Sequence, residues 1–562
     1  MLVSNKFFEG AVSCANWFYK KNAFLNLTDN VLYSTNSLST DEVSRVLNDI
    51  KLGSTSYIQT LDKEFFLILI DVREDLVHVI NDITGRDLVY YCEDNNSIST
   101  CFWEIIKVEE KSLKHVNPTS CKEFILMLAD VEHKTIVDGI EILPTSSVFT
   151  FSKNAKITKH KYWTYRIHEN SLASNEKYDQ LENCLDSFFS DLASRYKDVV
   201  FGVGVSGGLD SRLIPYYCNK HSILISPFII GEEKPNGLVR SNDHKRASEI
   251  CEKYSLPLVN HNFENHNFKG KIIKDARQAP STASQILKMP QTQFISFSHL
   301  ITGASGYIVG SSPFYGNPEN IDLTATIFNR QSVLKCFPKY KKTKKVLNYI
   351  FGSNFNVSEK LPFAFEGLLS HEEVSSLKAK VENYINTYKG LNNTEILMNY
   401  AVDILGQRNK MGAFESLLGD VESFTMYGPA MLKCVQSWNS KEIFNRSFFE
   451  NFIRERHPEL AAIKSQDHKS SLNITRESKL SKIRNIAEFA VRGRGVMNYE
   501  NWAKSRKFIN EVNNILEEYN YLEEILDLKL IIKNVNKGII SPLVLLNCLK
   551  INELMHLIDR GT

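Results

Sequence analysis

The sequence lacks several features that would assign a protein to a class at once. No apolar stretch among its 562 residues approaches the length of a membrane span, so we expect no transmembrane helix. The opening segment, MLVSNKFFEG, contains no basic region followed by an apolar one, so we expect no signal peptide. The 10 cysteines include no CxxC motif and no Cys/His metal spacing, which predicts reduced thiols and a cytoplasmic protein.

An excess of charge of one sign is also missing. The formal net charge is +2, which gives no reason to expect nucleic acid as a partner. With 43% hydrophobic and 23% charged residues, the composition is that of a globular protein. A chain of 562 residues is too long for one hydrophobic core and shows no internal repeat, so we predict two or more different domains.

The first 165 residues are rich in segments typical of β-strands. FFLILIDV (65–72) and DLVHVI (75–80) flank a short polar stretch, which predicts a hairpin. DLVYYCED (87–94) and SVFTFS (147–152) predict further strands. We therefore expect a β-rich first domain.

A polar segment, 166–177, predicts a linker, and from residue 178 the pattern changes. Apolar residues then recur at helical spacing on one face: Leu181, Leu185, Phe188, Phe189 and Leu192. Almost wholly apolar strands follow, separated by helical segments, which predicts a parallel sheet buried on both faces. These strands are DVVFGVGV (198–205), ILISPFII (223–230) and PLVNHNF (257–263). Beyond residue 370 the chain is mostly helical, with amphipathic helices from Tyr499, so the fold class is two-domain α/β.

The segment FGVGVSGGLDSRL (201–213) is the richest in glycine and joins the first of these strands to a helix. Gly202, Gly204 and Gly207 match the letters of the dinucleotide fingerprint G-x-G-x-x-G, but the first two fall inside the strand rather than in the turn. A Walker A loop is excluded because no G-K-[ST] follows.

A third interpretation is a phosphate loop formed by SGGLDS. Ser206, Gly207 and Gly208 leave backbone N–H groups at the N-terminus of a helix, where they suit a phosphate. Ser211 adds a hydroxyl donor, and Asp210 is placed to hold Mg²⁺ that bridges the phosphates of a nucleotide. The simplest alternative is a glycine-rich turn with a helix-capping aspartate.

At SGGLDS the chain resembles the PP-loop ATP pyrophosphatases, and within them the asparagine synthetase family. The resemblance implies an Ntn-type β-rich sandwich over 1–165 and a PP-loop synthetase domain over 178–562 with a helical C-terminal part. That C-terminal part looks most like family members from surface-polysaccharide gene clusters. The resemblance is carried by SGGLDS and by the segments 57–91, 134–152, 162–165, 241–258, 419–432 and 448–463.

The family cleaves ATP between the α and β phosphates, transfers AMP to a carboxylate, and lets an amine attack the acyl-adenylate. The resemblance therefore implies ATP and Mg²⁺ as cofactors, with Asp210 as the metal ligand and a catalytic residue. It implies ATP contacts at Val205, Ser206, Gly207, Gly208, Asp210, Ser211, Ile230, Gly231 and Gly303.

Two further catalytic groups are implied by resemblance. Glu422 in GDVESFTMYGPAML (419–432) is the candidate base for the attacking amine, with a salt bridge to Arg408 or Lys410 as the alternative role. Lys464, or else Lys469, is the candidate for stabilising the adenylate.

The sequence departs from the family in its glutaminase chemistry. Glutamine-dependent members carry a nucleophilic cysteine at position 2, where this chain has Leu2. Cys14 would need to be exposed by cleavage, and its surroundings do not resemble the family's start. We therefore expect a first domain without glutaminase activity, and nitrogen supplied as ammonia or as a substrate amine.

A second departure lies in HLITGASGYIVGSS (299–312). The family has a loop like S-G-x-G-x-D-E here, and its aspartate helps to hold Mg-pyrophosphate. This chain keeps Gly303 but has Tyr307 near the aspartate position, with Glu232 and Glu233 as possible replacements.

Three functional hypotheses stay open. The first is an ATP-dependent C–N ligase acting on a small-molecule or sugar carboxylate. The second is a cyclase of the lasso-peptide or β-lactam type, which closes a peptide-like carboxylate on its own amine. The third is a catalytically degenerate ATP-binding scaffold, and a homodimer is possible for each of the three.

Overall fold

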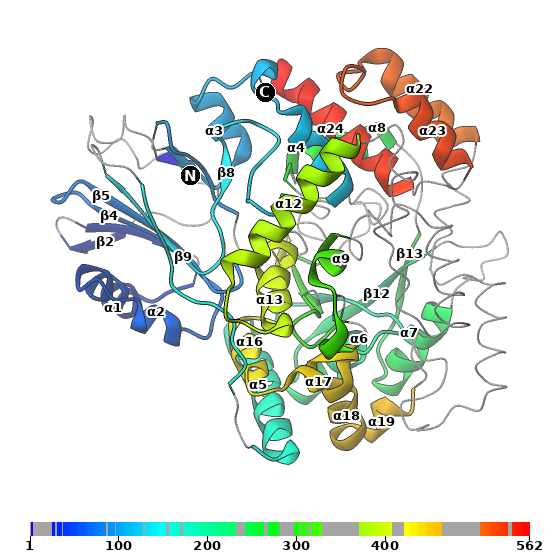
Figure 1. The fold of residues 1–562 in the computed structure, drawn as a ribbon. Helices are drawn as coiled ribbons and strands as arrows, with labels where there is room; N and C mark the ends of the chain where they lie inside the picture. Colours follow the sequence, from blue (N-terminus) through cyan, green and yellow to red (C-terminus); the bar gives the residue numbers. More distant parts are fainter. Residues whose placement is uncertain are drawn as a thin grey trace.

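The computed structural model is mixed α/β, with antiparallel and parallel sheets (Figure 1). It describes most of the chain and all of the elements named below. The described residues are 2–3, 25–28, 31–35, 37–85, 88–95, 97–127, 130–152, 157–168, 172–231, 242–262, 268–278, 280–281, 297–303, 305–311, 313–314, 317–328, 370–406, 421–463, 506–537 and 542–561.

The N-terminal part contains two antiparallel sheets. The larger has the order β10-β9-β5-β4-β3-β2 and the smaller the order β1-β7-β6-β8. The predicted hairpin is confirmed, because β4 and β5 pair in register from Asp71–Leu76 to Phe66–Asn81. The bounds are β1 Leu2–Val3, β2 Leu25–Thr28, β3 Val31–Thr35, β4 Phe66–Asp71, β5 Leu76–Asn81, β6 Tyr90–Cys92, β7 Ser97–Ser99, β8 Glu141–Ile142, β9 Ser147–Ser152 and β10 Thr158–Lys161.

The two sheets are packed between two helical layers, which explains why β4 is buried along its whole length. Phe66, Ile68 and Ile70 belong to the core between the sheets, whereas Leu67 and Leu69 belong to the core under the outer helices. Helices α1 (Thr40–Lys51) and α2 (Ser56–Thr60) contribute apolar side chains to that second core. Helix α3 (Phe102–Val108) contacts β6 and β7 of the smaller sheet, and α4 (Pro118–Met127) contacts α24 (Pro542–Asp559). The order of layers is therefore helix, sheet, sheet, helix.

A five-stranded parallel sheet forms the centre of the second part. Its order is β13-β12-β11-β14-β15, and each neighbouring pair is parallel. The predicted strands around 201, 225 and 259 are confirmed as β11 (Phe201–Gly204), β12 (Ile225–Gly231) and β13 (Val259–Asn262). The two other strands are β14 (His299–Thr302) and β15 (Glu422–Thr425).

Helices precede and connect these strands. Helix α5 confirms the predicted helix, but it begins at Ser174, so the polar segment 166–177 includes its first turn instead of being only a linker. The apolar face is buried as predicted, with Phe188 half-buried. The bounds are α5 Ser174–Arg195, α6 Asp210–Lys220, α7 Asn242–Lys253 and α8 Phe268–Gln278.

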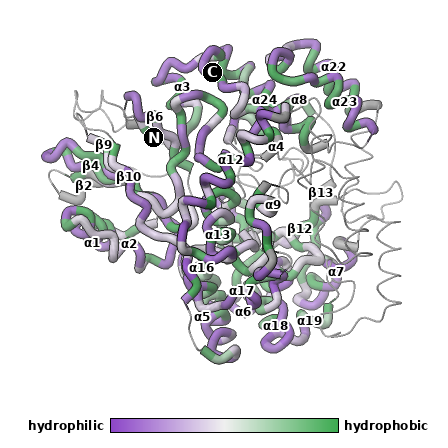
Figure 2. The backbone as a smooth tube through the Cα atoms, in the orientation of Figure 1, coloured by the Kyte–Doolittle hydropathy of each residue, from purple (hydrophilic) through white to green (hydrophobic). Residues whose placement is uncertain are grey.

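The remaining described residues are mostly helical, as predicted. Along α22 and α23 hydrophilic and hydrophobic residues alternate (Figure 2), as in amphipathic surface helices. The bounds are η3 Leu113–His115, η6 Pro318–Asn320, α9 Leu323–Phe328, α12 His371–Thr387, α13 Asn393–Tyr400, a π-helix Ala401–Gly406, α16 Pro429–Val435, α17 Ser440–Ile443, η12 Phe444–Arg446, α18 Ser447–Arg456, α19 Pro458–Ala461, α22 Arg506–Glu518, α23 Leu528–Asn536 and α24 Pro542–Asp559. Within the described ranges, no helix has both the length and the apolar character needed to cross a bilayer.

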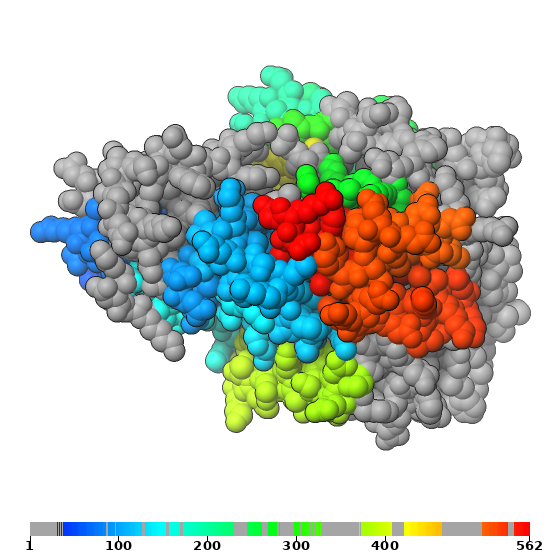
Figure 3. Space-filling model, turned by 90° about the horizontal axis from the view of Figure 1, so that it is seen from above, coloured from blue at the N-terminus to red at the C-terminus, as the bar shows by residue number. Residues whose placement is uncertain are grey.

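Helix α24 departs from the predicted amphipathic pattern, because nearly all of its described side chains are buried. It lies beside segments from far earlier in the chain, and Figure 3 shows the C-terminal residues next to the light-blue ones near residue 100. The amide of Asn547 donates to the carbonyl oxygen of Ile125 in α4 (3.1 Å), and Lys550 forms a fully buried ion pair with Asp275 of α8 (3.1 Å). One helix therefore joins both parts of the molecule.

A buried charge network also crosses between the two parts. Asp403 of the π-helix accepts hydrogen bonds from Thr145, from Lys161 of β10 and from Tyr388, the last at 2.8 Å. Burial alone would raise the pKa of Asp403, but the positive charge of Lys161 outweighs it and lowers the pKa. Asp403 is therefore a charged group that ties the N-terminal strands to the C-terminal helices.

A second contact between the parts contains a carboxyl pair. Lys380 of α12 donates to Glu123 of α4 at 2.7 and 2.9 Å and lies 3.7 Å from Asp130 and 3.9 Å from Glu132. Burial and the hydrogen bond with Asp130 raise the pKa of Glu123 to about 7, although Lys380 opposes the shift. The folded protein therefore binds a proton at Glu123 more tightly than the unfolded chain does.

This shift predicts how stability changes with pH. A carboxyl group whose pKa rises on folding, from 4.5 to about 7, stabilises the fold below pH 4.5 and loses that contribution as the pH rises through 7. Between pH 5 and pH 8 the unaltered protein should therefore lose about 2 kcal/mol more unfolding free energy than Glu123→Gln does. Urea unfolding at both pH values measures this difference.

The matched control is Glu382→Gln on the same helix as Lys380. Glu382 is about half exposed and lies 3.7 Å from Lys378. We expect its pH dependence to equal that of the unaltered protein. An unchanged slope in Glu123→Gln would show that the carboxyl pair does not titrate in this range.

Candidate functional site

The carboxyl ends of the central parallel strands form the candidate site. Strand β11 has β12 on one side and β14 on the other, so the strand order reverses direction between β11 and β14. Ligands of open α/β sheets bind in the crevice outside the carboxyl ends of the strands at such a reversal. The loops after β11, β14 and β15 all reach this point.

The predicted phosphate loop lies between β11 and α6. The Val205 N–H donates to the Phe228 carbonyl (2.9 Å), which fixes the start of the loop against β12. The Ser206 and Ser211 hydroxyl oxygens lie 3.0 Å apart, and the Gly208 N–H donates to Ser206 Oγ (3.2 Å). A Cβ atom on Gly208 would lie 3.3 Å from Ser206 Oγ and 3.5 Å from Ser211 Oγ, so a side chain would narrow this cradle. A phosphate suits a glycine-lined turn at a helix N-terminus.

The glycines of the dinucleotide pattern have a different role. Gly202 and Gly204 lie inside β11, as the sequence indicated. A Cβ atom on Gly202 would come within 2.4 Å of the Phe297 ring, so this glycine is required for packing on the strand. The geometry is therefore not that of a dinucleotide fingerprint, whose glycines form the turn.

Arg212 supports the loop from its buried side. Its guanidinium donates to the carbonyl oxygens of Gly207 (3.1 Å) and Gly208 (3.2 Å) in the loop, and to those of Leu460 (2.9 Å) and Ile463 (2.7 Å). Burial lowers the pKa of Arg212 to about 10, which leaves it charged at neutral pH. Arg212 was not among the residues predicted from the sequence, because its contacts with Leu460 and Ile463 lie far along the chain.

Asp210 meets the loop that follows β14. A Cβ atom on Gly303 would lie 2.6 Å from Asp210 Cβ, and one on Gly306 would lie 3.6 Å from Asp210 Oδ2. Glycine at 303 is thus required by the close approach of the two loops. The structure therefore brings together the predicted ATP contacts Ser206, Asp210 and Gly303.

Two residues that the sequence analysis missed hold the Asp210 carboxylate. Arg446 donates to Asp210 Oδ1 through Nη2 (2.5 Å) and to Oδ2 through Nη1 (3.2 Å). The Tyr427 hydroxyl, just beyond β15, donates to Asp210 Oδ1. The Asp210 and Arg446 side chains are 24% and 12% exposed, so most of the pair is covered.

The backbone that carries Arg446 adopts an unusual conformation. Asn445 and Arg446 have φ values of 59° and 58°, in the left-handed region, which costs about 1–2 kcal/mol per residue. The loop after β14 supports it, because Asn445 N–H donates to the Phe314 carbonyl (2.7 Å). Gly310, with φ 84°, lies so close that a Cβ atom would fall 1.7 Å from the Ile443 carbonyl oxygen. Strain of this kind at a crevice is typical of functional positions.

Tyr307 occupies the position where the resemblance implied a carboxylate. Its side chain is 2% exposed and packs on the π-helix, where a Cβ atom on Gly406 would lie 2.4 Å from its hydroxyl. Burial raises the pKa of Tyr307 above its usual range, so the hydroxyl stays neutral. Tyr307 therefore does not supply the missing charge at Asp210.

The described residues do not fit the implied Mg²⁺. Mg²⁺ requires near-octahedral oxygen ligands at about 2.1 Å. Both Asp210 oxygens already accept hydrogen bonds from a guanidinium, and a dication on the same oxygens would repel it. Within the described ranges, no group of three or more His, Cys, Asp or Glu side chains is arranged to hold a metal.

Glu422, the predicted base, lies at the start of β15. It pairs across the sheet with His299 at the start of β14, and its carboxylate lies 3.6 Å from the His299 ring. The phosphate loop follows the other end of the strands, roughly 10 Å along the strand at 3.3 Å per residue. The role of Glu422 as a base stays a prediction.

The other predicted residues divide into two groups. Ile230 and Gly231 end β12 at the carboxyl edge, as required for a nucleotide slot. Ile463, whose carbonyl is bound by Arg212, brings the chain beside the loop just before position 464. The predicted residues outside the described ranges are Cys14, Glu232, Glu233, Arg408, Lys410, Lys464 and Lys469.

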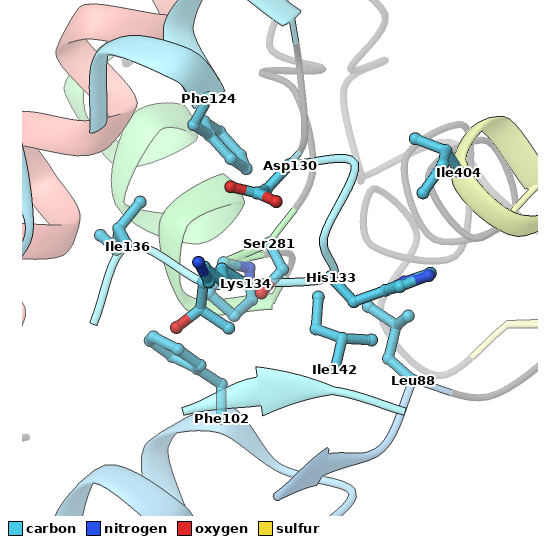
Figure 4. A pocket seen from close by; sticks show the side chains of 12 residues that line it. Leu88, Phe102, Phe124, Asp130, His133, Lys134, Ile136, Ile142, Ser281 and Ile404 are labelled. Atoms are coloured by element: carbon cyan, nitrogen blue, oxygen red, sulfur yellow. The ribbon is translucent and has the colours of Figure 1, made fainter. Parts of the chain in front are cut away.

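A small cavity lies elsewhere, where the two parts meet (Figure 4). Its volume is about 30 Å³, enough for one or two waters and far below that of a substrate pocket. Asp130, His133 and Lys134 line it together with Phe102 and Phe124. The strand-end crevice therefore remains the candidate site.

The buried position of Arg212 generates a prediction. Arg212→Met removes the donors to four carbonyl oxygens, two of them in fully buried hydrogen bonds, and should reduce the unfolding free energy by about 3 kcal/mol. Urea unfolding measures the loss. The control Arg195→Met removes an exposed ion pair with Asp191 and should change stability by less than about 0.5 kcal/mol. Equal effects of both substitutions would contradict the supporting role.

Neither the models of known protein families nor the curated proteins contain a match to this chain. The features that bear on function are therefore the phosphate loop, the reversal of strand order and the charges around Asp210.

Proposed function

We propose that residues 178–562 bind ATP at the carboxyl edge of the parallel sheet and transfer AMP to a substrate carboxylate. Ammonia or a substrate amine then attacks the acyl-adenylate, forms the C–N bond and releases AMP. In this proposal the protein is an asparagine-synthetase-like ligase of the PP-loop type. The observation that carries it is the meeting of SGGLDS with the loops after β14 and β15 at a reversal of strand order.

The proposed chemistry needs positioning and charge neutralisation more than covalent catalysis. A carboxylate oxygen attacks the α-phosphorus of ATP, the α–β phosphoanhydride bond breaks, and pyrophosphate leaves. The first turn of α6, together with Ser206 and Ser211, is suited to hold the leaving phosphates through N–H and O–H donors. Ile230 and Gly231 at the end of β12 are suited to line the adenine slot.

The N-terminal part has a supporting role in this proposal. Its helix–sheet–sheet–helix layers are consistent with an Ntn-type domain that has lost the nucleophile. Asp403, Lys380 and α24 attach it firmly to the rest of the chain. We propose that it covers the synthetase part, while nitrogen enters as ammonia or as the amine of a small-molecule or peptide substrate.

A second candidate function is a catalytically silent nucleotide-binding protein. Two observations favour it: Glu422 lies at the start of β15, and Asp210 is held by Arg446. This candidate shares the nucleotide site with the first but predicts no adenylate. Pyrophosphate exchange separates them, because labelled pyrophosphate enters ATP only where an acyl-adenylate forms reversibly.

The ligase is tested by its products. With a panel of amino acids, uronic acids and short peptides as acids and ammonia as the amine, turnover should release AMP and pyrophosphate in equal amounts, as chromatography will measure. Formation of ADP with product would contradict the proposal. ATP binding without exchange for any acid would favour the silent protein.

The site itself is tested by a glycine substitution. Gly208→Val should weaken ATP binding at least about tenfold, because its methyl groups fill the cradle beside Ser206 and Ser211. Gly204→Ala is the control, since its Cβ atom would meet only the Phe228 ring at 3.8 Å. Calorimetry gives the affinities and circular dichroism checks the fold. Equal affinity in Gly208→Val would exclude this loop as the nucleotide site.

A further inference from the structure

Asp210, which was expected to hold a metal, forms an ion pair with a side chain of the protein itself. Arg446 contacts both oxygens of Asp210, and Tyr427 donates a third hydrogen bond to Oδ1. A bidentate guanidinium–carboxylate pair is among the strongest and most directional contacts in proteins. The charge of Asp210 is therefore balanced by a group that belongs to this chain.

Arg446 is held in place from several sides. Its guanidinium carbon lies 4.8 Å from the centre of the Phe449 ring, and Nη2 is 3.5 Å from the Tyr427 hydroxyl oxygen. Its backbone is left-handed and is supported by the loop after β14 through Phe314 and Gly310. Three chain segments thus fix one cation beside the phosphate loop.

The arrangement changes the electrostatics expected of the site. A metal on Asp210 would bring two positive charges to the phosphates, and the second carboxylate that usually assists is replaced by the buried Tyr307. The Arg446 guanidinium contacts both oxygens of Asp210, so the pair carries no net charge. The carboxylate next to the phosphate loop is therefore neutralised without a metal.

We infer that Arg446 takes the place of the metal: its guanidinium neutralises Asp210 beside the phosphates of the bound nucleotide, and binding requires no divalent cation. This inference rests on the proposed nucleotide site but holds for the ligase and for the silent protein alike. Tyr427 and Phe449 also contact the guanidinium and keep it in place.

The first experiment compares ATP binding in EDTA and in Mg²⁺ by calorimetry on the full chain. We expect dissociation constants that agree within about threefold. A metal-dependent site would lose at least about tenfold in EDTA. Inorganic pyrophosphate is the second probe, and it should bind equally in both solutions because it presents only the phosphate part of the ligand.

Asp210→Asn distinguishes an Asp210 that holds a metal from one that is paired with Arg446, because the two predict different changes of ATP affinity. If Asp210 held a metal, the substitution would reduce ATP affinity in Mg²⁺ at least about tenfold. If Arg446 neutralises Asp210, asparagine removes the anion and leaves the guanidinium, which Tyr427 and Phe449 also contact, as an unbalanced cation beside the phosphates. We then expect an affinity no lower than that of the unaltered protein.

Arg446→Gln provides the direct test. In EDTA its affinity for ATP should fall at least about tenfold, and Mg²⁺ should restore part of it because Asp210 is released for the metal. Arg456→Gln is the matched control: Arg456 lies on the adjoining helix α18 and pairs with Asp179 at 2.6 Å, away from the loop. Its affinity should be unchanged.

Each result decides between the possibilities. Binding by the unaltered protein only in Mg²⁺, or a loss of affinity in Asp210→Asn, would overturn the inference and leave the proposed function standing. Absence of ATP binding under both conditions would overturn both. If Arg446→Gln fails to fold, the chelator comparison and Asp210→Asn still decide.

Discussion

The negative charge of Asp210 is the constraint around which the site is arranged. A largely covered carboxylate is costly unless it is paired and hydrogen-bonded, and here Arg446 and Tyr427 provide the partners. The partners come from far along the chain, so the loops after β14 and β15 must pass closely over the start of α6. The glycines at 303 and 310 and the left-handed turn at 445–446 follow from that requirement.

Much of the fold is predictable because it depends on short-range patterns. The apolar runs at 65–72 and 198–205 became strands since such segments are stable only when covered on both faces. Helix α6 begins at Asp210, where the glycines end. The conformation of SGGLDS was predictable in the same way, because the first N–H groups of any helix have no partner within the helix.

The partners of that loop were not predictable in the same way. Resemblance to a motif does not say where along a strand Glu422 falls, and in the structure it is the first residue of β15. Arg446 is separated from Asp210 by 236 positions, and nothing near it in the sequence indicates a contact. Helix α24 was predicted to be amphipathic, yet it is buried on nearly all sides because its polar residues, such as Lys550, have buried partners.

The position of α24 has a consequence for how the chain is made. Asn547 completes a hydrogen bond with Ile125, which lies 422 positions earlier. At 5–20 residues per second, a ribosome adds those residues in about 20–80 s. During that interval α24 is not yet there to cover α4, so the side of α4 that α24 contacts in the folded protein stays open to solvent.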